Sequence, residues 1–373
     1  KARNEAIEKA KNFSEKVTDK ERLYIEASFA RNSEKYLAIL QQIANRYPKE
    51  KFVHHLLGRY YQTRNPDKAL EEYNKVLELD PRYGLALNQI AYIYVDMKNY
   101  EKAIEYFNKY ASASPGDANP FDLLAETYFW MGRVNEAIAK YKEALEVKPD
   151  FYQSMHSIQY VYAVKEDYSE ALKWIDKYID IAPSPGVKRA GYLWKGFYLC
   201  LLGSFEKSLV DLQRAEELAE VVRDDVAKAF VNILKAWTYY DMGKLNLSRK
   251  CNEAWLDVYL KNYPKTTQIY KSGFNLLLGF IELKENKIDS AKARLAEIKS
   301  LFPELELIPS QDARKEWVPY YYNLLYAELL LAEGSPEKAI SIFEKVSPPG
   351  LAGFVSAEEM IRYNIPILKD VLA

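Results

Sequence analysis

Along most of the chain, apolar residues recur at intervals of three and four, the spacing that places them on one face of an α-helix. The run YNKVLELDPRYG, from Tyr73 to Gly84, shows where such a helix ends. Proline cannot continue a helix and disfavours helical geometry at the residue before it, so Pro81 predicts a helix boundary. Similar endings follow at Pro115, Pro149 and Pro183, each 34 residues after the last. A strict period of this size predicts an array of repeats.

Within each period, the pattern predicts two helices joined by a short polar turn. Between Gly84 and Pro115, the first helix reads LALNQIAYIYVDM, the turn is centred on Lys98 and Asn99, and the second helix reads YEKAIEYFNKYA. The next unit has Gly132 at its turn. The chain is therefore expected to be all-α.

Small residues recur at one position of each helix, where they would let the two helices of a pair cross closely. Helix axes approach to about 8 Å only where the side chains at the crossing are small. On first helices these residues are Gly58, Ala91, Ala125, Gly196, Ala236, Gly279 and Ala327; on second helices they are Ala69, Ala103, Ala137, Ala171, Ser208, Ser248, Ala291 and Ala339. The large residues expected beside the crossings are Tyr61, Tyr94, Tyr128, Tyr162, Tyr73, Phe107, Tyr141, Leu295 and Phe343, so most of the 31 tyrosines are assigned to packing. Gln159 interrupts the first column, and there we expect either a slight splay or an amide turned toward solvent.

The order small residue, aromatic, alanine, aromatic, alanine, proline resembles the tetratricopeptide repeat (TPR) family through four consecutive units. The resemblance implies a right-handed superhelical solenoid of eight or nine helix-turn-helix repeats over residues 1–373. Repeats are regular over 1–183 and divergent over 184–346, because the insert SPGVKR after Pro183 breaks the period. Residues 347–373 predict a loop and a helix containing Pro366. This helix is either a solvating cap or, as we favour, the start of a truncated repeat.

A second resemblance concerns context. The segments VTDKERLYIEA, LDPRYG and NPFDLLAETYFWMGR are similar to TPR segments of prokaryotic multidomain signalling and regulatory proteins, where they follow a kinase, cyclase or DNA-binding domain. Because the chain starts at Lys1 rather than Met, we expect its natural N-terminus to have been cut off or processed. A cytoplasmic location is favoured, although targeting signals cannot be read from this chain.

Composition and charge exclude several classes of partner. The chain has 52 Lys and Arg residues against 53 Asp and Glu residues, for a net charge of −1. Nucleic-acid binding requires a basic excess or stripe, so DNA and RNA are not expected as partners. No stretch approaches the about 18 continuous apolar residues of a membrane span, so membrane insertion is not expected. Cys200 and Cys251 lie in apolar helical sequence and predict buried free thiols.

Residues that could support catalysis or bind a metal are few. His54 and His55 are adjacent on a helix and point about 100° apart, so they cannot share a metal ion as histidines at i and i+4 can. His156 lies several repeats away. Gly-rich phosphate loops, nucleophile elbows and HExxH motifs are absent from the sequence. We therefore expect a protein that is not an enzyme, with no catalytic residue, metal or cofactor.

In stacked helix pairs, the first helices line the concave face, and solenoids bind partners there. The TPR resemblance places a polar set on this face in the regular repeats, namely His55, Arg59, Asn88, Tyr92, Asp122, Glu126, His156 and Tyr160. In the divergent repeats the equivalent set is apolar except for Glu328, and comprises Leu193, Phe197, Ile233, Trp237, Leu276, Phe280 and Leu324. The polar set suits a peptide or a small polar ligand. The apolar set is either a hydrophobic peptide groove or a face that the chain itself covers.

The leading hypothesis is a scaffold that binds a protein or peptide segment in this groove. Arg59 would pair with an acidic group, and Tyr92 and Tyr160 would stack or form hydrogen bonds. Phe197, Trp237 and Phe280 would bury apolar side chains of the partner. The alternative is a regulatory sensor array that binds a small ligand, or self-associates as a homo-oligomer, to control an attached domain.

One known TPR function can be tested against the sequence. Chaperone-binding TPR domains grip a C-terminal carboxylate with Lys and Asn on one first helix, Asn on the next, and Lys and Arg on the third. The matching residues here are His55, Arg59, Gln89, Asn119 and Leu123. This clamp is absent, so Hsp70 and Hsp90 tails are not expected as partners.

Overall fold

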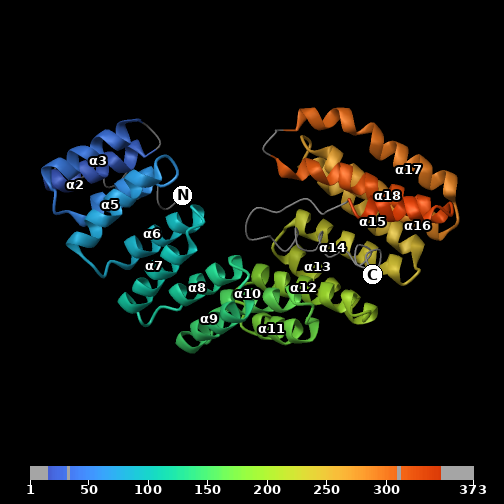
Figure 1. Ribbon diagram of the computed structural model, residues 1–373, viewed down its shortest axis with the longest axis horizontal. Coiled ribbons are helices and arrows are strands. Elements are labelled where there is room, and N and C mark those ends of the chain that lie inside the picture. Colours follow the sequence, from blue (N-terminus) through green and yellow to red (C-terminus); the bar gives the residue numbers. More distant parts are fainter. Residues whose placement is uncertain (1–15, 32–33, 309–311, 346–373) are drawn as a thin grey trace. The chain divides into compact units, whose positions relative to one another are not determined.

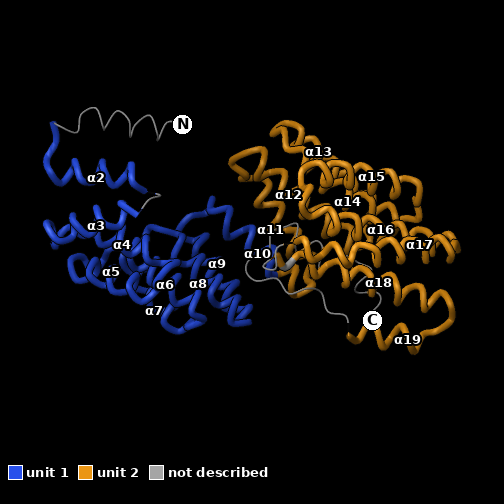
Figure 2. The backbone as a smooth tube through the Cα atoms, turned by 90° about the horizontal axis from the view of Figure 1, so that it is seen from above, with its two compact units in different colours: residues 1–161 blue, residues 162–373 orange. Residues whose placement is uncertain are grey.

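The computed structural model describes residues 16–31, 34–308 and 312–345, which fall in two compact units, residues 1–161 and 162–373 (Figure 2). Over the described ranges, all regular secondary structure is helical, with eighteen α-helices and two short 3₁₀ helices. Consecutive helices from α2 to α19 follow the predicted helix-turn-helix design. Eight pairs pack together, namely α2 with α3, α4 with α5, α6 with α7, α8 with α9, α12 with α13, α14 with α15, α16 with α17 and α18 with α19. The predicted all-α solenoid fold is confirmed. The predicted helix around Pro366 lies outside the described residues.

Unit 1 contains the regular repeats. From α2 to α9, each first helix packs on the second helix of its own repeat, and the second helices α3, α5 and α7 pack on the first helix of the next repeat. In Figure 1, α6 and α8 lie along one side of this unit, and α7 and α9 along the other. Its helices are α2 (Asp19–Ala30), α3 (Glu34–Arg46), α4 (Lys51–Tyr61), α5 (Pro66–Leu79), α6 (Gly84–Asp96), α7 (Tyr100–Ala113), α8 (Asn119–Trp130), α9 (Val134–Val147) and α10 (Tyr152–Val164), which crosses the unit boundary.

Unit 2 contains the divergent repeats, and its five helices from α12 to α16 have 17 or 18 residues, against 11 to 14 in unit 1. These longer helices account for the looser spacing after Pro183. The elements are α11 (Tyr168–Asp180), α12 (Pro185–Leu201), α13 (Phe205–Val221), α14 (Asp225–Asp241), α15 (Leu245–Asn262), α16 (Thr267–Lys284), α17 (Ile288–Ser300), η2 (Phe302–Leu307), η3 (Ala313–Glu316), α18 (Trp317–Ala332) and α19 (Pro336–Phe343).

The joint at Pro81 connects two repeats. Helix α5 ends at Leu79, and the carboxylate of Asp80 lies 2.5 Å from the ammonium group of Lys51 at the start of α4. The same ammonium group lies 4.9 Å from the ring centre of Tyr83, just before α6. The proline therefore ends one helix at a point where three successive helices are held together.

The turns inside the repeats share one backbone feature. At equivalent positions, Gly132, Gly203, Gly243 and Gly334 adopt φ of 70° to 74°, and Lys98, Glu166 and Asn286 adopt φ of 56° to 62°. This left-handed conformation is easy for glycine and costs free energy for other residues. The turns predicted at Lys98 and Gly132 are confirmed.

The predicted columns of small residues lie at the helix crossings. Every alanine and serine of both columns is fully buried. A Cβ atom added to Gly58 would stand 2.6 Å from the ring of Tyr73, and one added to Gly279 would stand 2.5 Å from Leu325. These distances are too short for any side chain, so the helices of these pairs cross where only glycine fits.

Two details differ from the sequence prediction. For Gln159 the sequence left two alternatives, a slight splay of the repeat or an amide turned toward solvent. Gln159 is fully buried, so the second alternative is wrong. The splay of that repeat stays a prediction. Cys200 is a buried free thiol as expected, whereas Cys251 is half-buried. No described helix has both the length and the apolar character that crossing a membrane requires.

Candidate functional site

The predicted groove residues of unit 1 occupy two positions on each first helix, three residues before and one residue after the small residue at the crossing. Positions four apart share one face of a helix. The eight residues of this polar face are His55 and Arg59 on α4, Asn88 and Tyr92 on α6, Asp122 and Glu126 on α8, and His156 and Tyr160 on α10. All eight belong to unit 1.

His55 is a packing residue at one end of the polar face. Its ring lies 5.7 Å from Tyr73, 5.8 Å from Tyr83 and 6.3 Å from Phe52, measured between ring centres. Burial, together with the nearby charge of Arg59, lowers the pKa of His55 to about 4. The imidazole is therefore neutral at physiological pH.

Arg59 is exposed, and its guanidinium group forms no ion pair with any described residue. One turn before His55, Phe52 leaves 45% of its surface exposed, and Leu85 at the equivalent place on α6 leaves 53% exposed. Both apolar residues share the helix face of the polar set, because they precede His55 and Asn88 by three residues. Sequence reasoning missed them, although their spacing was a readable signal.

On α6, Asn88 and Tyr92 lie between this apolar end and the acidic residues of α8. The side-chain oxygen of Asn88 is buried and has no hydrogen-bond partner. The ring of Tyr92 packs edge-on against Phe107, with ring centres 5.8 Å apart. Burial, together with the nearby carboxyl groups of Glu126 and Asp122, raises the pKa of Tyr92 to about 12. The tyrosine thus stays a neutral hydrogen-bonding group beside two acids.

Asp122 and Glu126 are one turn apart on α8 and are half-buried. Burial raises the pKa of Asp122 to about 6, and the hydroxyl of Ser154 opposes this by donating a hydrogen bond of 2.5 Å to its carboxylate. Burial and the charge of Asp122 raise the pKa of Glu126 to about 7, against a hydrogen bond from Trp130. Neither carboxylate forms an ion pair with a described residue. Two poorly hydrated acids therefore face each other with no cation.

The α10 end of the polar face is more buried. Burial lowers the pKa of the half-buried His156 to about 4. Tyr160 is 9% exposed, and its ring packs edge-on against Phe129 at 5.6 Å between centres. These two residues thus offer a partner less accessible surface than Arg59 does.

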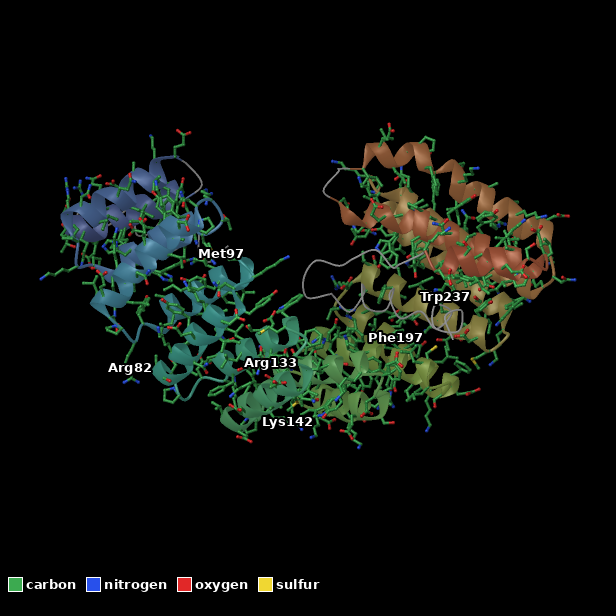
Figure 3. The ribbon with its side chains drawn as sticks, viewed as in Figure 1. Arg82, Met97, Arg133, Lys142, Phe197 and Trp237 are labelled. Atoms are coloured by element: carbon green, nitrogen blue, oxygen red, sulfur yellow. The ribbon has the colours of Figure 1, made fainter. Side chains whose placement is uncertain are left out.

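In unit 2, the three predicted apolar contact residues are almost completely buried. Phe197 is 4% exposed, Trp237 6% and Phe280 3%. The ring of Trp237 lies 6.0 Å from that of Phe280, and Phe197 lies 6.2 Å from Trp194. Figure 3 shows Phe197 on α12 and Trp237 on α14. They contribute to the core, and their contact with a partner stays a prediction.

Residues 59–118 and 123–184 match the tetratricopeptide repeat family. These two stretches are tetratricopeptide repeats. Among solved structures, a TPR protein from Parabacteroides merdae is 16% identical, with 78% of this chain and 99% of that chain covered and a TM-score of 0.53, which supports the fold. MamA is 22% identical over 46% of this chain and 92% of its own, with a TM-score of 0.39. YrrB, described as a TPR protein with an unusual peptide-binding site, is 19% identical over 48% and 91%, with a TM-score of 0.37. No curated protein matches the chain.

The chemistry available to this chain is that of recognition. TPR arrays are protein-interaction scaffolds, and within the described ranges no three His, Cys, Asp or Glu side chains are placed to hold a metal ion. The polar face carries an exposed guanidinium group, a buried amide oxygen and two carboxyl groups, and the exposed side chains of Phe52 and Leu85 lie beside it. The exposed groups among these are ones that a peptide can contact directly.

Proposed function

We propose that the polar face of unit 1, together with Phe52 and Leu85, binds an extended peptide or protein segment. The observation that carries this proposal is the presence of charged groups without ionic partners. Arg59 on α4 and both carboxylates on α8 lack ion pairs among the described residues, and the two carboxylates are half-buried, where a missing cation costs more free energy than at the surface. Charges left unpaired on a recurring face are groups that a partner can satisfy.

The arrangement suggests the chemistry of the bound segment. Phe52 and Leu85 would cover apolar side chains, and Arg59 would pair with an acidic side chain next to them. Asp122 and Glu126 would accept a basic side chain, which would favour their ionised form and lower their pKa values. The preferred ligand is therefore a segment with an apolar and an acidic part at the α4 end and a basic part at the α8 end.

The test begins with selection of peptides from a random display library on the whole immobilised chain. Affinity of a selected peptide is then measured by fluorescence anisotropy for wild type and for Arg59→Glu. Reversal of an exposed charge facing an acidic side chain is expected to weaken binding roughly tenfold, with the loss reduced at high salt. Because Arg59 is exposed and unpaired, circular dichroism and melting temperature should stay unchanged.

Lys142→Glu is the matched control. Lys142 is also exposed and unpaired among the described residues, but it lies on the second helix α9, away from the polar face (Figure 3). The control makes the same change in net charge and should leave affinity within about twofold of wild type. Equal affinities for wild type and Arg59→Glu, or equal losses in both variants, would show that peptides do not bind at this face.

A further inference from the structure

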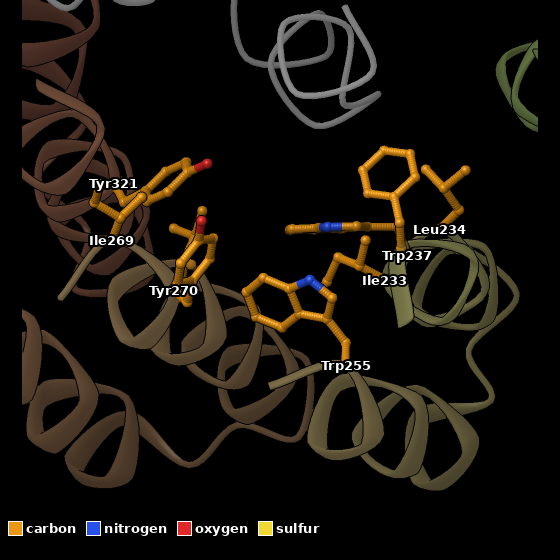
Figure 4. Close-up of a pocket in the computed structure, with 10 residues that line it drawn as sticks. Ile233, Leu234, Trp237, Trp255, Ile269, Tyr270 and Tyr321 are labelled. Atoms are coloured by element: carbon orange, nitrogen blue, oxygen red, sulfur yellow. The ribbon is translucent and has the colours of Figure 1, made fainter. Parts of the chain in front are cut away.

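Unit 2 contains a small cavity between α14, α15, α16 and α18 (Figure 4). Its walls include Trp237, Trp255, Tyr270, Leu276 and Tyr321. We infer that this cavity binds a small branched aliphatic group that carries a carbonyl oxygen, either in a free molecule or in a leucine residue of a peptide. This inference does not depend on the proposed function of unit 1.

The cavity lies at helix positions that the sequence analysis assigned to the groove. Ile233, Trp237 and Leu276 are three of the apolar groove positions, and all three line it. The other members of the apolar set are not among its lining residues, and Phe197 and Phe280 are almost fully buried. The predicted groove positions of unit 2 are therefore closely packed at Phe197 and Phe280, whereas beside Trp237 they border the cavity.

The size of the cavity limits its ligand. The enclosed space is about 50 Å³. Apolar cavities of about 150 Å³ accept benzene, whereas one water requires roughly 10–15 Å³. The space here suits a group of a few carbon atoms, such as an isopropyl or isobutyl group, and is too small to enclose an aromatic ring.

The walls determine the polarity of the ligand. None of the ten lining residues is Asp, Glu, Lys, Arg or His, so a charged group would lose its hydration without gaining an ionic partner. Aromatic rings can attract a quaternary ammonium group, and a positive charge near the rings opposes that attraction. Arg314 lies at the hydroxyl of Tyr270, with its nitrogen 3.5 Å from that oxygen. A neutral apolar group is therefore favoured over a cation.

One polar atom in the wall lacks a partner. Trp255 is 5% exposed, and its indole nitrogen is buried without a hydrogen-bond acceptor. In Figure 4 this nitrogen lies on the edge of the ring that faces Ile233 and Trp237. An unmade hydrogen bond at a buried donor costs about 1–3 kcal/mol, so an acceptor on the ligand would recover free energy. This donor is the reason for adding a carbonyl oxygen to the ligand.

Gly273 gives a direct way to fill the space. It lines the cavity from the middle of α16, and a Cβ atom there would stand 3.5 Å from Tyr321 and 3.6 Å from Trp255, which are ordinary contacts. Gly273→Leu would therefore begin without a clash and extend into the cavity. Ile233→Phe offers an independent way to fill it from α14. Val210→Phe adds similar bulk at a position on α13 that is 55% exposed, and serves as the control.

The experiment follows the indole N–H signals of the whole chain by NMR. The six tryptophans give six such signals, and Trp255→Phe assigns one of them. Isovaleramide should shift the Trp255 and Trp237 signals saturably, while tetramethylammonium should not. Trp255→Phe should weaken isovaleramide binding roughly fivefold when the Trp237 signal is followed, because it removes one hydrogen bond. N-acetyl-leucinamide tests whether the same site accepts a leucine residue.

Gly273→Leu and Ile233→Phe should abolish the isovaleramide shift, and Val210→Phe should preserve it. Absence of a saturable shift in the wild type would overturn the inference. So would an undiminished shift in a filled variant that retains the wild-type amide spectrum, or tighter binding of tetramethylammonium than of isovaleramide. Binding of isovaleramide without N-acetyl-leucinamide supports a free small molecule as the natural ligand, and binding of both supports a leucine residue.

Discussion

The pair Asp122 and Glu126 allows the electrostatics of the polar face to be tested through stability. We consider the double variant Asp122→Asn, Glu126→Gln, which replaces two carboxyl groups by neutral amides of nearly the same shape. Burial raises the pKa of Asp122 from 3.8 to about 6, and that of Glu126 from 4.5 to about 7. No cation among the described residues compensates them. Ionising these acids in the folded chain therefore costs free energy that the unfolded chain does not lose.

The sign follows from proton linkage. Each carboxyl group has a higher pKa in the folded chain than in the unfolded chain. At a pH between these two pKa values the folded chain binds more protons, so the free energy of unfolding falls as the pH rises. Below about pH 3, both states are protonated and no penalty exists. Above about pH 8, the penalty is complete and stability no longer changes with pH for this reason.

The magnitude follows from the shifts. One pKa unit corresponds to about 1.4 kcal/mol, so shifts of about two units give roughly 3 kcal/mol for each acid. Part of the pKa shift of Glu126 comes from the charge of Asp122, so this repulsion is relieved once in the double variant and the two energies do not add in full. We therefore expect the double variant to be more stable than wild type by about 3–5 kcal/mol at pH 8, and by less than about 1 kcal/mol near pH 4.

Urea unfolding followed by circular dichroism, at several pH values between about 4 and 8, measures this difference. A solenoid can unfold in more than one step, so the first transition is fitted separately. The control is Asp67→Asn, Glu71→Gln, two exposed acids with the same spacing on α5. A gain that does not change with pH, or that equals the gain of the control, would refute the reasoning. Carbon-13 NMR titration of the two carboxyl groups checks it independently, and normal pKa values would refute it as well.

Two further predictions concern the frame of the repeats. Lys98→Gly should stabilise the chain by about 1 kcal/mol, because glycine adopts the left-handed backbone conformation of this turn without strain. Gly132→Ala should destabilise the chain by a similar amount for the same reason. A lower melting temperature for Lys98→Gly and a higher one for Gly132→Ala would contradict this. The ammonium group of Lys235 lies 2.7 Å from the half-buried carboxylate of Glu216. Lys235→Met should lower the free energy of unfolding, measured in urea, by about 3 kcal/mol, because the carboxylate loses its cation. Lys235→Arg should retain most of that stability, and equal losses in both variants would contradict the role of the charge.

Much of the fold could be predicted from the sequence because the constraints are local and repeated. A glycine such as Gly58 faces the ring of Tyr73 at a helix crossing, and glycine or alanine recurs at the equivalent position of most first helices. Pro81 ends a helix through its own covalent geometry. The boundary between the units, inside α10, left no comparable signal, because it depends on contacts between residues far apart in the chain.

The candidate site was less predictable, because exposure and pKa depend on what lies opposite a side chain. The helical register identified Arg59 and His55 as neighbours on one face, but not that one is exposed and the other buried among three rings. It indicated the acids of α8 without their raised pKa values, which come from burial. Phe52 and Leu85 were missed because an apolar residue on an amphipathic helix is usually assigned to the core.

The apolar positions of unit 2 show why periodicity alone left two alternatives open. A period of 3.6 residues specifies the direction in which Trp237 and Phe280 point, but it carries no information on how much protein lies in that direction. In the structure both side chains are buried, yet Trp237 also forms part of a cavity wall whose buried donor, on Trp255, has no acceptor. Close packing would have removed such a gap if stability alone had shaped this face, since unfilled space and an unpaired donor both cost free energy. A ligand that fills this cavity and supplies an acceptor would therefore gain free energy on binding, as would a partner that pairs with the charges of unit 1.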